Sequence, residues 1–253
     1  MIECHIKNRI ARITLNRPEK RNAINDQLIR ELQSALASTA SNDSVAVTLI
    51  AAAGPDFCAG LDIAMLQEAA NATGLDHLES ARSLGALFAA IRNHPHPVVA
   101  CVQGRALGGG CGLVTACDIV LSAESAQFGY PEVGLGFVPA IVMSMLRHSL
   151  GEKRAFELLV SAKPVAAREA LEIGLVTRVY PDAQFESCVE QYVAELAEKS
   201  ASALTLTKKL WRHIDDLPFE AALEAGAQIN AIARMTDDAR QGFQRFARPK
   251  TSK

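Results

Sequence analysis

Three consecutive glycines, at positions 108–110, precede an apolar segment whose pattern predicts a helix. Glycine lets the backbone approach a ligand closely, because it has no Cβ atom. The first N–H groups of a helix have no intrahelical partner and lie at the positive end of the helix dipole, where they stabilise an anion. Glu132 follows Pro131 on a turn and could transfer a proton. An anion site and one carboxylate are the minimum needed to form an enolate and protonate it again.

A second loop with glycine follows the apolar segment 45–51, and Gly60 in this loop again allows a close approach of backbone. An oxyanion hole needs convergent hydrogen-bond donors aimed at one oxygen, and two loops could supply one each. The backbone amides of Leu61 and Gly109 are the donors that we expect. Each loop alone fits a tight turn equally well, so the presence of both is what favours an oxyanion hole.

Several motifs occur in a fixed order that is more specific than any one of them: segments 15–25, 57–63, 104–111, 117–119, 128–132 and 134–139. With these segments the chain resembles the enoyl-CoA hydratase/isomerase (crotonase) family nearly from end to end. The resemblance implies an α/β fold, a crotonase-like spiral of ββα units with a helical C-terminal trimerisation region. It also implies a coenzyme A thioester as the substrate, with its carbonyl oxygen held by the amides of Leu61 and Gly109.

One position departs from the family pattern. Hydratases of this family commonly carry a glutamate directly after the Gly-Gly-Gly-Cys segment, where this chain has Gly112. The other family glutamate corresponds to Glu132, which is present. A lone carboxylate can move a proton from one carbon to another, which is double-bond isomerisation. It can also activate water and then return the proton, which is hydration.

Three functions therefore stay open. The first is an enoyl-CoA hydratase that acts on a 2-enoyl-CoA thioester, of branched or glutaconyl type, with Glu132 as acid and base. The second is a Δ3,Δ2-enoyl-CoA isomerase in which Glu132 is the single proton shuttle. The third is a divergent acyl-CoA binder without catalysis. The overall resemblance favours the hydratase, whereas the lone carboxylate favours the isomerase.

The resemblance also implies contacts with coenzyme A in two turns, at Lys20, Arg21, Ala23, Ala59, Asp62 and Ile63. Lys20 and Arg21 fit a solvated basic turn as well. Asp62 could instead be the N-cap of a helix over 63–70. Lys250 is similar to a basic residue that reaches the coenzyme A of a neighbouring subunit, but it lies in a polar terminal segment, 236–253, that we expect to be mobile.

The segment 64–80 is the one that varies in this family and decides the acyl group. A polar side chain from it could replace the carboxylate that is missing at Gly112, and Glu68 and Glu79 are the candidates. A solvated helix face is the alternative explanation for both glutamates.

Composition sets limits on the function. The chain has 253 residues and a formal net charge of −2, which argues against a nucleic-acid partner. No apolar run approaches the roughly 18 residues of a membrane span, and the first residues lack the pattern of a signal peptide. The six cysteines form no CxxC pair, which indicates reduced thiols and a cytoplasmic location.

Neither a metal site nor a separate cofactor is expected, since coenzyme A is part of the substrate. Cys58 and Cys111 flank the predicted site and could be nucleophiles or small packing residues. The six histidines are scattered, and we expect no Ser-His-Asp triad.

Apolar periodicity predicts alternating strands and helices up to about residue 184 and helices alone after it. The expected strands are 3–7, 10–16, 45–51, 98–102, 119–123 and 175–179, and the first two form a hairpin. The expected helices are 26–39, 76–91, 139–148, 152–160, 166–173, 185–197, 201–213 and 218–235, and Asn25 and Asp26 can cap the first of them. We divide the chain into a core with the acyl-CoA site, 1–195, and a helical region for assembly, 196–253. The resemblance implies a homotrimer or a dimer of trimers.

Overall fold

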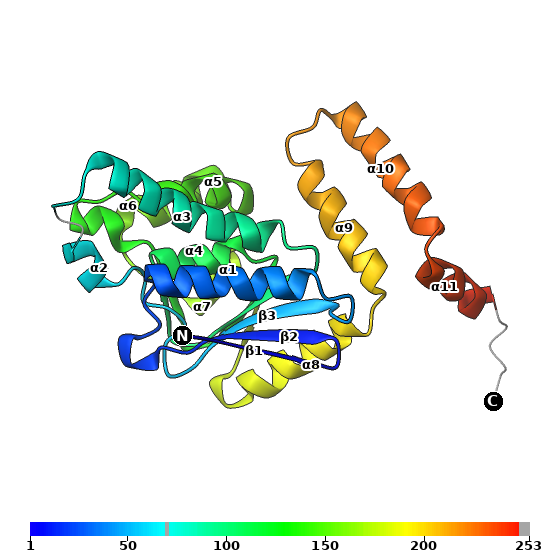
Figure 1. Cartoon of the computed structure of the whole chain (residues 1–253), viewed down its shortest axis with the longest axis horizontal. Coiled ribbons are helices and arrows are strands. Elements are labelled where there is room, and N and C mark those ends of the chain that lie inside the picture. The colour runs from blue at the N-terminus through cyan, green and yellow to red at the C-terminus, as the bar shows by residue number, and fades with distance from the viewer. Residues whose placement is uncertain (69–70, 248–253) are drawn as a thin grey trace.

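A twisted sheet of mostly parallel strands forms the centre of the molecule (Figure 1). The computed structural model describes residues 1–68 and 71–247. Within these residues, six strands pair in the order β1-β2-β3-β4-β6-β9, and only β1 and β2 are antiparallel. The strands are β1 (Ile2–Lys7), β2 (Ile10–Leu15), β3 (Val47–Ala52), β4 (Val98–Val102), β6 (Ile119–Ala123) and β9 (Arg178–Tyr180).

The first hairpin shows how local sequence sets the pairing. Asn8 and Arg9 connect β1 to β2 with φ angles of 50° and 65°. Two successive residues with positive φ form the tight turn that matches the twist of an antiparallel pair. The register follows, with Lys7 opposite Ile10 and Ile2 opposite Leu15. The predicted hairpin is therefore confirmed.

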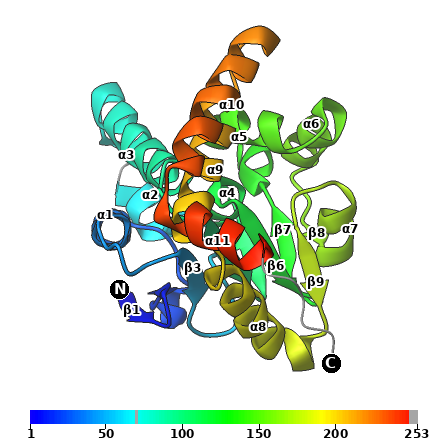
Figure 2. The same ribbon diagram turned by 90° about the vertical axis from the view of Figure 1, so that its right-hand side faces the viewer.

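Helices cover both faces of this sheet. One face packs on α1 (Asp26–Ala40), α3 (Gly74–Arg92), α4 (Gly109–Ala116) and α5 (Ala140–Ser149). The other face packs on α8 (Phe185–Ala197), as Figures 1 and 2 show. Neighbouring residues of β3 divide between the two cores, since Leu49 lies in the cluster under α8 and Ile50 lies in the cluster under α1. A strand buried on both faces explains why its sequence is continuously apolar.

Capping residues fix where the two long helices begin. The Asn25 side chain accepts a hydrogen bond from the N–H of Leu28 at the start of α1, as predicted. At the start of α3, Thr73 and Asp76 form a reciprocal capping box. This box moves the start of α3 two residues before the predicted position.

A second, smaller sheet was not predicted. Within the described residues it consists of β5 (Arg105–Leu107), β7 (Gln127–Gly129) and β8 (Val165–Ala166), in the order β5-β7-β8. These strands are too short to show an alternating pattern in the sequence. The sheet joins the segment before Gly108 to the segment that leads to Glu132, because Leu107 lies opposite Gly129.

The remaining elements connect the two sheets and extend the chain. They are η1 (Pro18–Lys20), α2 (Ile63–Glu68), η3 (Pro131–Leu135), α6 (Glu152–Ser161), α7 (Ala167–Glu172) and η4 (Asp182–Gln184). The predicted helices 139–148, 152–160 and 166–173 correspond to α5, α6 and α7. The predicted strand 175–179 is wrong at its start, because Leu175 and Val176 are buried in a turn and β9 begins at Arg178.

The C-terminal helices project from the rest of the molecule (Figure 1). They are α9 (Ala201–His213), α10 (Phe219–Arg234) and α11 (Asp237–Ala247). The expectation of a mobile segment from residue 236 is wrong as far as residue 247. The Thr236 hydroxyl accepts a hydrogen bond from the N–H of Ala239, and the Asp238 carboxylate accepts bonds from the hydroxyls of Ser200 and Ser202. Lys250 lies outside the described residues.

The boundary that we placed after residue 195 falls two residues before the end of α8, which packs on the sheet. No helix of the described residues has the length and apolarity to cross a membrane.

A buried charged cluster attaches α9 to the body. Lys208 Nζ lies 2.6 Å from Asp118 Oδ2 and donates to the carbonyl oxygens of Ile91 and His96. Arg212 Nη2 lies 2.8 Å from Asp118 Oδ1. Asp118 Oδ2 also accepts a hydrogen bond from the N–H of Val98. One carboxylate at the start of β6 therefore joins α9 to the sheet.

We expect Asp118→Ala to lower the free energy of unfolding by about 3–5 kcal/mol, because Lys208 would remain buried without its anion. Urea denaturation measures this change. Glu157→Ala is the matched control, since it removes an exposed ion pair with Arg154 that is worth about 0–1 kcal/mol. An equal loss in both variants would contradict the proposed role of Asp118.

Candidate active site

The start of α4 depends on a backbone conformation that favours glycine. Gly108 is the N-cap of the helix, with φ 50° and ψ −123°. Its N–H donates a 2.8 Å hydrogen bond to the carbonyl oxygen of Gly129, which fixes the helix start against β7. Gly109 follows as the first helical residue, so its N–H has no carbonyl four residues earlier in the helix to bind.

The loop after β3 lies against this helix start. The N–H of Cys58 donates to the oxygen of Arg105 at 2.9 Å, and the N–H of Leu107 donates to the oxygen of Cys58 at 3.0 Å. Gly60 has a φ of 104°, and a Cβ atom on it would lie 3.1 Å from the Leu107 oxygen. The two loops are thus in backbone contact, as a shared oxyanion hole with one donor from each loop requires.

The predicted oxyanion-hole donors lie side by side. Ile24 binds both neighbours of Leu61, because its N–H donates to the Gly60 oxygen and its oxygen accepts from the N–H of Asp62. Successive peptide groups of an extended chain point in opposite directions, so the N–H of Leu61 faces away from Ile24. A Cβ atom on Gly109 would lie 3.8 Å from the Leu61 side chain. Among the described turns, loops and caps, neither amide donates to a backbone oxygen.

The side chain of Glu132, in η3, lies near the start of α4. A Cβ atom on Gly108 would lie 3.1 Å from Glu132 Oε1. The other oxygen, Oε2, is buried and has no hydrogen-bond partner within the described part of the chain. Burial disfavours the charged form and therefore raises the pKa of Glu132 above its usual range. A carboxylate of raised pKa with one unpartnered oxygen is suited to accept and return a proton.

Tyr130 holds the segment before Glu132. It is fully buried, and its hydroxyl forms a 2.7 Å hydrogen bond with Thr115 Oγ1 in α4. The Tyr130 hydroxyl is therefore engaged with α4, and the residue acts as a packing anchor for the turn that carries Glu132.

The position of the second family glutamate is closed by apolar atoms. A Cβ atom on Gly112 would lie 2.5 Å from Phe88 Cζ and 2.9 Å from Val142 Cγ1. Both distances are shorter than real Cβ contacts. The sequence did not point to Phe88 or Val142, because their nearness to Gly112 arises from the packing of α3 and α5 on α4.

Two glutamates were the candidates for a replacement carboxylate. Glu79 is exposed on α3, and the side chain of Glu68 lies outside the described residues. The predicted helix 63–70 is described only as α2, which ends at Glu68.

The predicted coenzyme A contacts cluster around two joined turns. The N–H of Ala59 donates to the Arg21 oxygen at 3.0 Å, and Lys20 and Arg21 are exposed. The N–H of Ile24 donates to Gly60 next to buried Ala23. The structure therefore brings most of the predicted positions together at one edge of the site.

Asp62 has a structural role beside this edge. Its carboxylate lies 2.6 Å from Arg17 Nη1 and accepts a 3.0 Å hydrogen bond from the N–H of Ala64. The hydrogen bonds from Arg17 lower the pKa of Asp62. This geometry supports the alternative role of Asp62 as a helix cap, and the neighbouring Ile63 exposes its side chain to solvent.

A second ion pair stiffens the two loops. Arg105 donates to both oxygens of Asp56 at 2.8 Å, and its backbone N–H donates to Oδ1 at 3.0 Å. These bonds lower the pKa of the Asp56 carboxyl. Asn22, which is fully buried, donates to the oxygens of Ala53 and Asp56. No local pattern in the sequence predicts these supports, because residues 22, 56 and 105 meet only in the folded chain.

The cysteines beside the site are packing residues. Cys58 and Cys111 are fully buried, and burial raises the pKa of each thiol to about 12. Neither is a thiolate at neutral pH, so neither is an activated nucleophile. All six cysteines are unpaired, and in the described residues no group of three His, Cys, Asp or Glu side chains could hold a metal ion.

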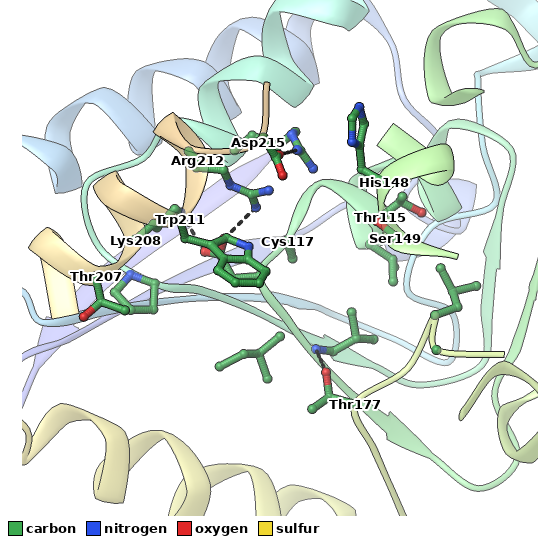
Figure 3. A pocket seen from close by; sticks show the side chains of 18 of the residues that line it. Thr115, Cys117, His148, Ser149, Thr177, Thr207, Lys208, Trp211, Arg212 and Asp215 are labelled. Carbon is green, nitrogen blue, oxygen red and sulfur yellow. Dashed lines mark hydrogen bonds and ion pairs between the residues drawn. The ribbon is translucent and has the colours of Figure 1, made fainter. Parts of the chain in front are cut away.

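A cavity of about 450 Å³ lies at the opposite end of α4 from Glu132, between α9 and the body (Figure 3). Thr115 and Cys117 line it from α4, and Lys208, Trp211 and Arg212 line it from α9. Its lining does not include Leu61, Gly109 or Glu132, so it is separate from the candidate active site.

Sequence comparison places these features among known proteins. The family model described as enoyl-CoA hydratase/isomerase matches residues 5–252. The chain is 31% identical over 246 residues to the 2,3-dehydroadipyl-CoA hydratase of Escherichia coli, and the aligned region covers 97% of this chain and 94% of that protein. It is 34% identical over 248 residues to the crotonyl-CoA hydratase of Syntrophomonas wolfei, covering 95% and 92%.

Solved structures show a similar likeness. AtuE of Pseudomonas aeruginosa superposes with a TM-score of 0.94 at 31% identity, covering 98% of this chain and 96% of that chain. An enoyl-CoA hydratase of Mycobacterium smegmatis superposes with a TM-score of 0.91 at 28% identity, covering 97% and 95%. The predicted fold, a crotonase-like α/β spiral with a helical C-terminal region, is confirmed by these likenesses.

Replacing Gly108 with Ala should lower turnover by about 100-fold, because a Cβ atom would displace the Glu132 carboxylate and strain the backbone at positive φ. Steady-state kinetics with an enoyl-CoA thioester measures the loss. Gly226→Ala in α10 is the matched control, since a Cβ atom there meets nothing within 4 Å. Full activity of Gly108→Ala would show that the close approach is not required.

The raised pKa of Glu132 also predicts a stability difference. A carboxyl whose folded-state pKa is raised contributes stability below its unfolded pKa, and the contribution is lost as pH rises through the folded pKa. Glutamine is neutral throughout. Glu132→Gln should therefore unfold at a higher temperature than the wild type at neutral pH, and the difference should vanish on acidification. Thermal unfolding over a pH series measures this, and a difference independent of pH would contradict it.

Proposed function

We propose that this chain, which belongs to the enoyl-CoA hydratase/isomerase family, adds water to the 2,3 double bond of a 2-enoyl-CoA thioester. The observation that carries the proposal is the position of Glu132. Its half-buried carboxylate, whose Oε2 has no hydrogen-bond partner among the described residues, lies beside Gly108, where α4 begins and two loops supply free amides. The hydratases among its relatives support the same reaction.

In this mechanism the amides of Leu61 and Gly109 hold the thioester oxygen. Negative charge develops on that oxygen when a nucleophile adds at C3, so donors placed there stabilise the transition state more than the substrate. The positive end of the α4 dipole acts in the same direction. Since both donors are backbone groups held by neighbouring hydrogen bonds, they need little reorganisation during the reaction.

Glu132 performs both proton transfers. Its carboxylate takes a proton from water as the water oxygen bonds to C3, and the C2–C3 double-bond electrons move toward the thioester to give the enolate. The protonated Glu132 then delivers a proton to C2, which regenerates the thioester and the carboxylate. One water is added, and the raised pKa of Glu132 favours its protonated form, the form that delivers the proton to C2.

The second candidate is a Δ3,Δ2-enoyl-CoA isomerase, and the packing at Gly112 favours it. A hydratase of the two-glutamate type needs a carboxylate at this position, where Phe88 and Val142 fill the space. Isomerisation needs only one carboxylate to carry a proton from C2 to C4. The third interpretation, a binder without catalysis, leaves the buried and unpartnered Oε2 atom of Glu132 unexplained.

We propose that coenzyme A enters only as part of the substrate and that no separate cofactor is needed. Lys20 and Arg21 lie exposed at the joined turns, where they suit the phosphates, and Ala23, Ala59, Asp62 and Ile63 line the same edge. The segments 128–132 and 136–140 resemble those of family hydratases that act on branched or glutaconyl-type thioesters, and this resemblance supports an acyl group of that type.

For assembly we propose a homotrimer or a dimer of trimers. The C-terminal helices expose large apolar side chains at Trp211, Phe219, Leu223, Met235 and Phe243. Large apolar side chains exposed to solvent in one region of a chain are typical of interfaces between subunits. The unpaired cysteines support a cytoplasmic location.

Glu132→Gln should abolish turnover while leaving thioester affinity within a few-fold of the wild type, because the glutamine keeps the shape of the site and the two amides remain. Product mass after incubation with 2-enoyl-CoA and 3-enoyl-CoA thioesters measures turnover, and calorimetry measures affinity. A mass gain of one water supports the hydratase, and an unchanged mass with shifted retention supports the isomerase.

Activity of Glu132→Gln within a few-fold of the wild type would remove Glu132 from the mechanism. Glu124→Gln is the control variant, since Glu124 is an exposed glutamate that pairs with Arg168 away from the site. Thioester binding by the wild type without any product would support the non-catalytic binder instead.

A further inference from the structure

We propose that Phe88 is a specificity-determining residue of this enzyme, because its ring occupies the space in which a second carboxylate would act. This inference rests on the proposed function, and it concerns how the enolate is resolved after it has formed. It follows from three features of the described residues: the position of Gly112, the packing of Phe88, and the chemistry of an apolar wall.

Gly112 lies one helical turn beyond the residue that contacts Glu132. Its N–H donates a 2.9 Å hydrogen bond to the oxygen of Gly108, and one turn advances about 5.4 Å along the axis. Gly108 is the residue whose missing Cβ atom leaves room for Glu132 Oε1. A side chain at position 112 would therefore start close to the reacting groups.

Phe88 fills this space from α3. The Cζ and Cε2 atoms of its ring would lie 2.5 and 2.9 Å from a Cβ atom at position 112, and Val142 from α5 closes the other side. Phe88 is 2% exposed, and its neighbours Leu87 and Ile91 on α3 are fully buried. A ring surrounded by packed side chains cannot move away cheaply, since interiors are close-packed.

The wall that results is apolar. A phenyl ring and a valine methyl cannot hold a water molecule by hydrogen bonds, and a polar group left against them would be unsatisfied. In a site with two carboxylates, water is held from two sides. Here Glu132 must position and deprotonate water without help from a side chain at position 112. Hydration is therefore slowed relative to migration of the double bond.

The same wall leaves double-bond migration unaffected. Glu132 takes a proton from C2 of a 3-enoyl thioester, and the electrons of the broken C2–H bond give a dienolate. The same proton then goes to C4, where the C3–C4 double-bond electrons form the new C–H bond, while the enolate electrons form the C2–C3 double bond and the thioester carbonyl is restored. No atom is gained or lost, and no water needs to be held. Phe88 thus sets the ratio of hydration to migration.

A stability cycle tests the competition for space. We expect Gly112→Ala to lower the unfolding temperature in the wild type and to cost less in a Phe88→Leu background, because the shorter side chain leaves room for the added methyl group. Leu87→Ala is the matched control background. Leu87 is buried on the same helix, but none of the three atoms nearest to a Cβ atom at position 112 belongs to it. An equal cost of Gly112→Ala in all three backgrounds would overturn the proposal.

A kinetic experiment tests the consequence. The double variant Phe88→Ala/Gly112→Glu should raise the ratio of hydration to migration by about tenfold or more over the wild type, since a positioned acid–base group contributes 100-fold or more. Mass and retention of the products from 2-enoyl-CoA and 3-enoyl-CoA thioesters give the ratio. A ratio within twofold of the wild type, in a folded variant, would overturn the proposal.

One further measurement separates this proposal from the proposed function. Exchange of the C2 proton of a saturated acyl-CoA with deuterium from D2O requires only Glu132 and the two amides. A wild type that neither exchanges this proton nor turns over either thioester would refute the proposed function. A wild type that exchanges the proton, combined with an unchanged ratio in the double variant, would refute the role of Phe88 alone.

Discussion

The close approach of two backbone segments, at Gly60 and at Gly108, is the constraint on which the candidate site depends. A Cβ atom on either glycine would meet the other loop or the Glu132 carboxylate at 3.1 Å. Both residues have positive φ, where side chains of L-residues are strained. Without this approach the amides of Leu61 and Gly109 could not converge on one oxygen. The sheets, the hairpin and the helix caps act together to hold the two loops at this distance.

The half-buried carboxylate of Glu132, with one unpartnered oxygen, is costly, because burial removes the hydration that stabilises its charge. The chain tolerates Glu132 in this state because Tyr130 and Thr115 bind its turn to α4 and β7 binds the turn to the loop. Glu132 in its charged form therefore lowers the stability of the folded chain, and we propose that this favours proton exchange at its carboxylate. The neighbouring thiols of Cys58 and Cys111, by contrast, are made inert by the same burial. Burial thus raises the pKa of both kinds of group. It favours the protonated carboxyl, which can donate a proton, and it keeps the thiols protonated and unreactive.

Features with local signals could be predicted from the sequence, and features that depend on distant partners could not. The hairpin at Asn8, the Asn25 cap and the buried parallel strands follow from a few adjacent residues. The three glycines and Glu132 indicated the site because their types are unusual in one short stretch. The small sheet was missed because each strand is only two or three residues long. The wall at Gly112 was missed because Phe88 comes from another helix, and α11 was missed because Asp238 finds its partners at Ser200 and Ser202.

The ion pair between Asp56 and Arg105 has a consequence for how the site opens. It joins the loop after β3 to the start of β5, and the Cys58 hydrogen bonds to Arg105 and Leu107 run alongside it. Neither loop can leave its place without breaking the same set of bonds, so the two loops form one cooperative unit in the sense used for local unfolding. The two amides that we propose as oxyanion donors are then gained and lost in a single event. Amides in these two loops should exchange with solvent at a common rate, although 40 to 50 residues separate them along the chain.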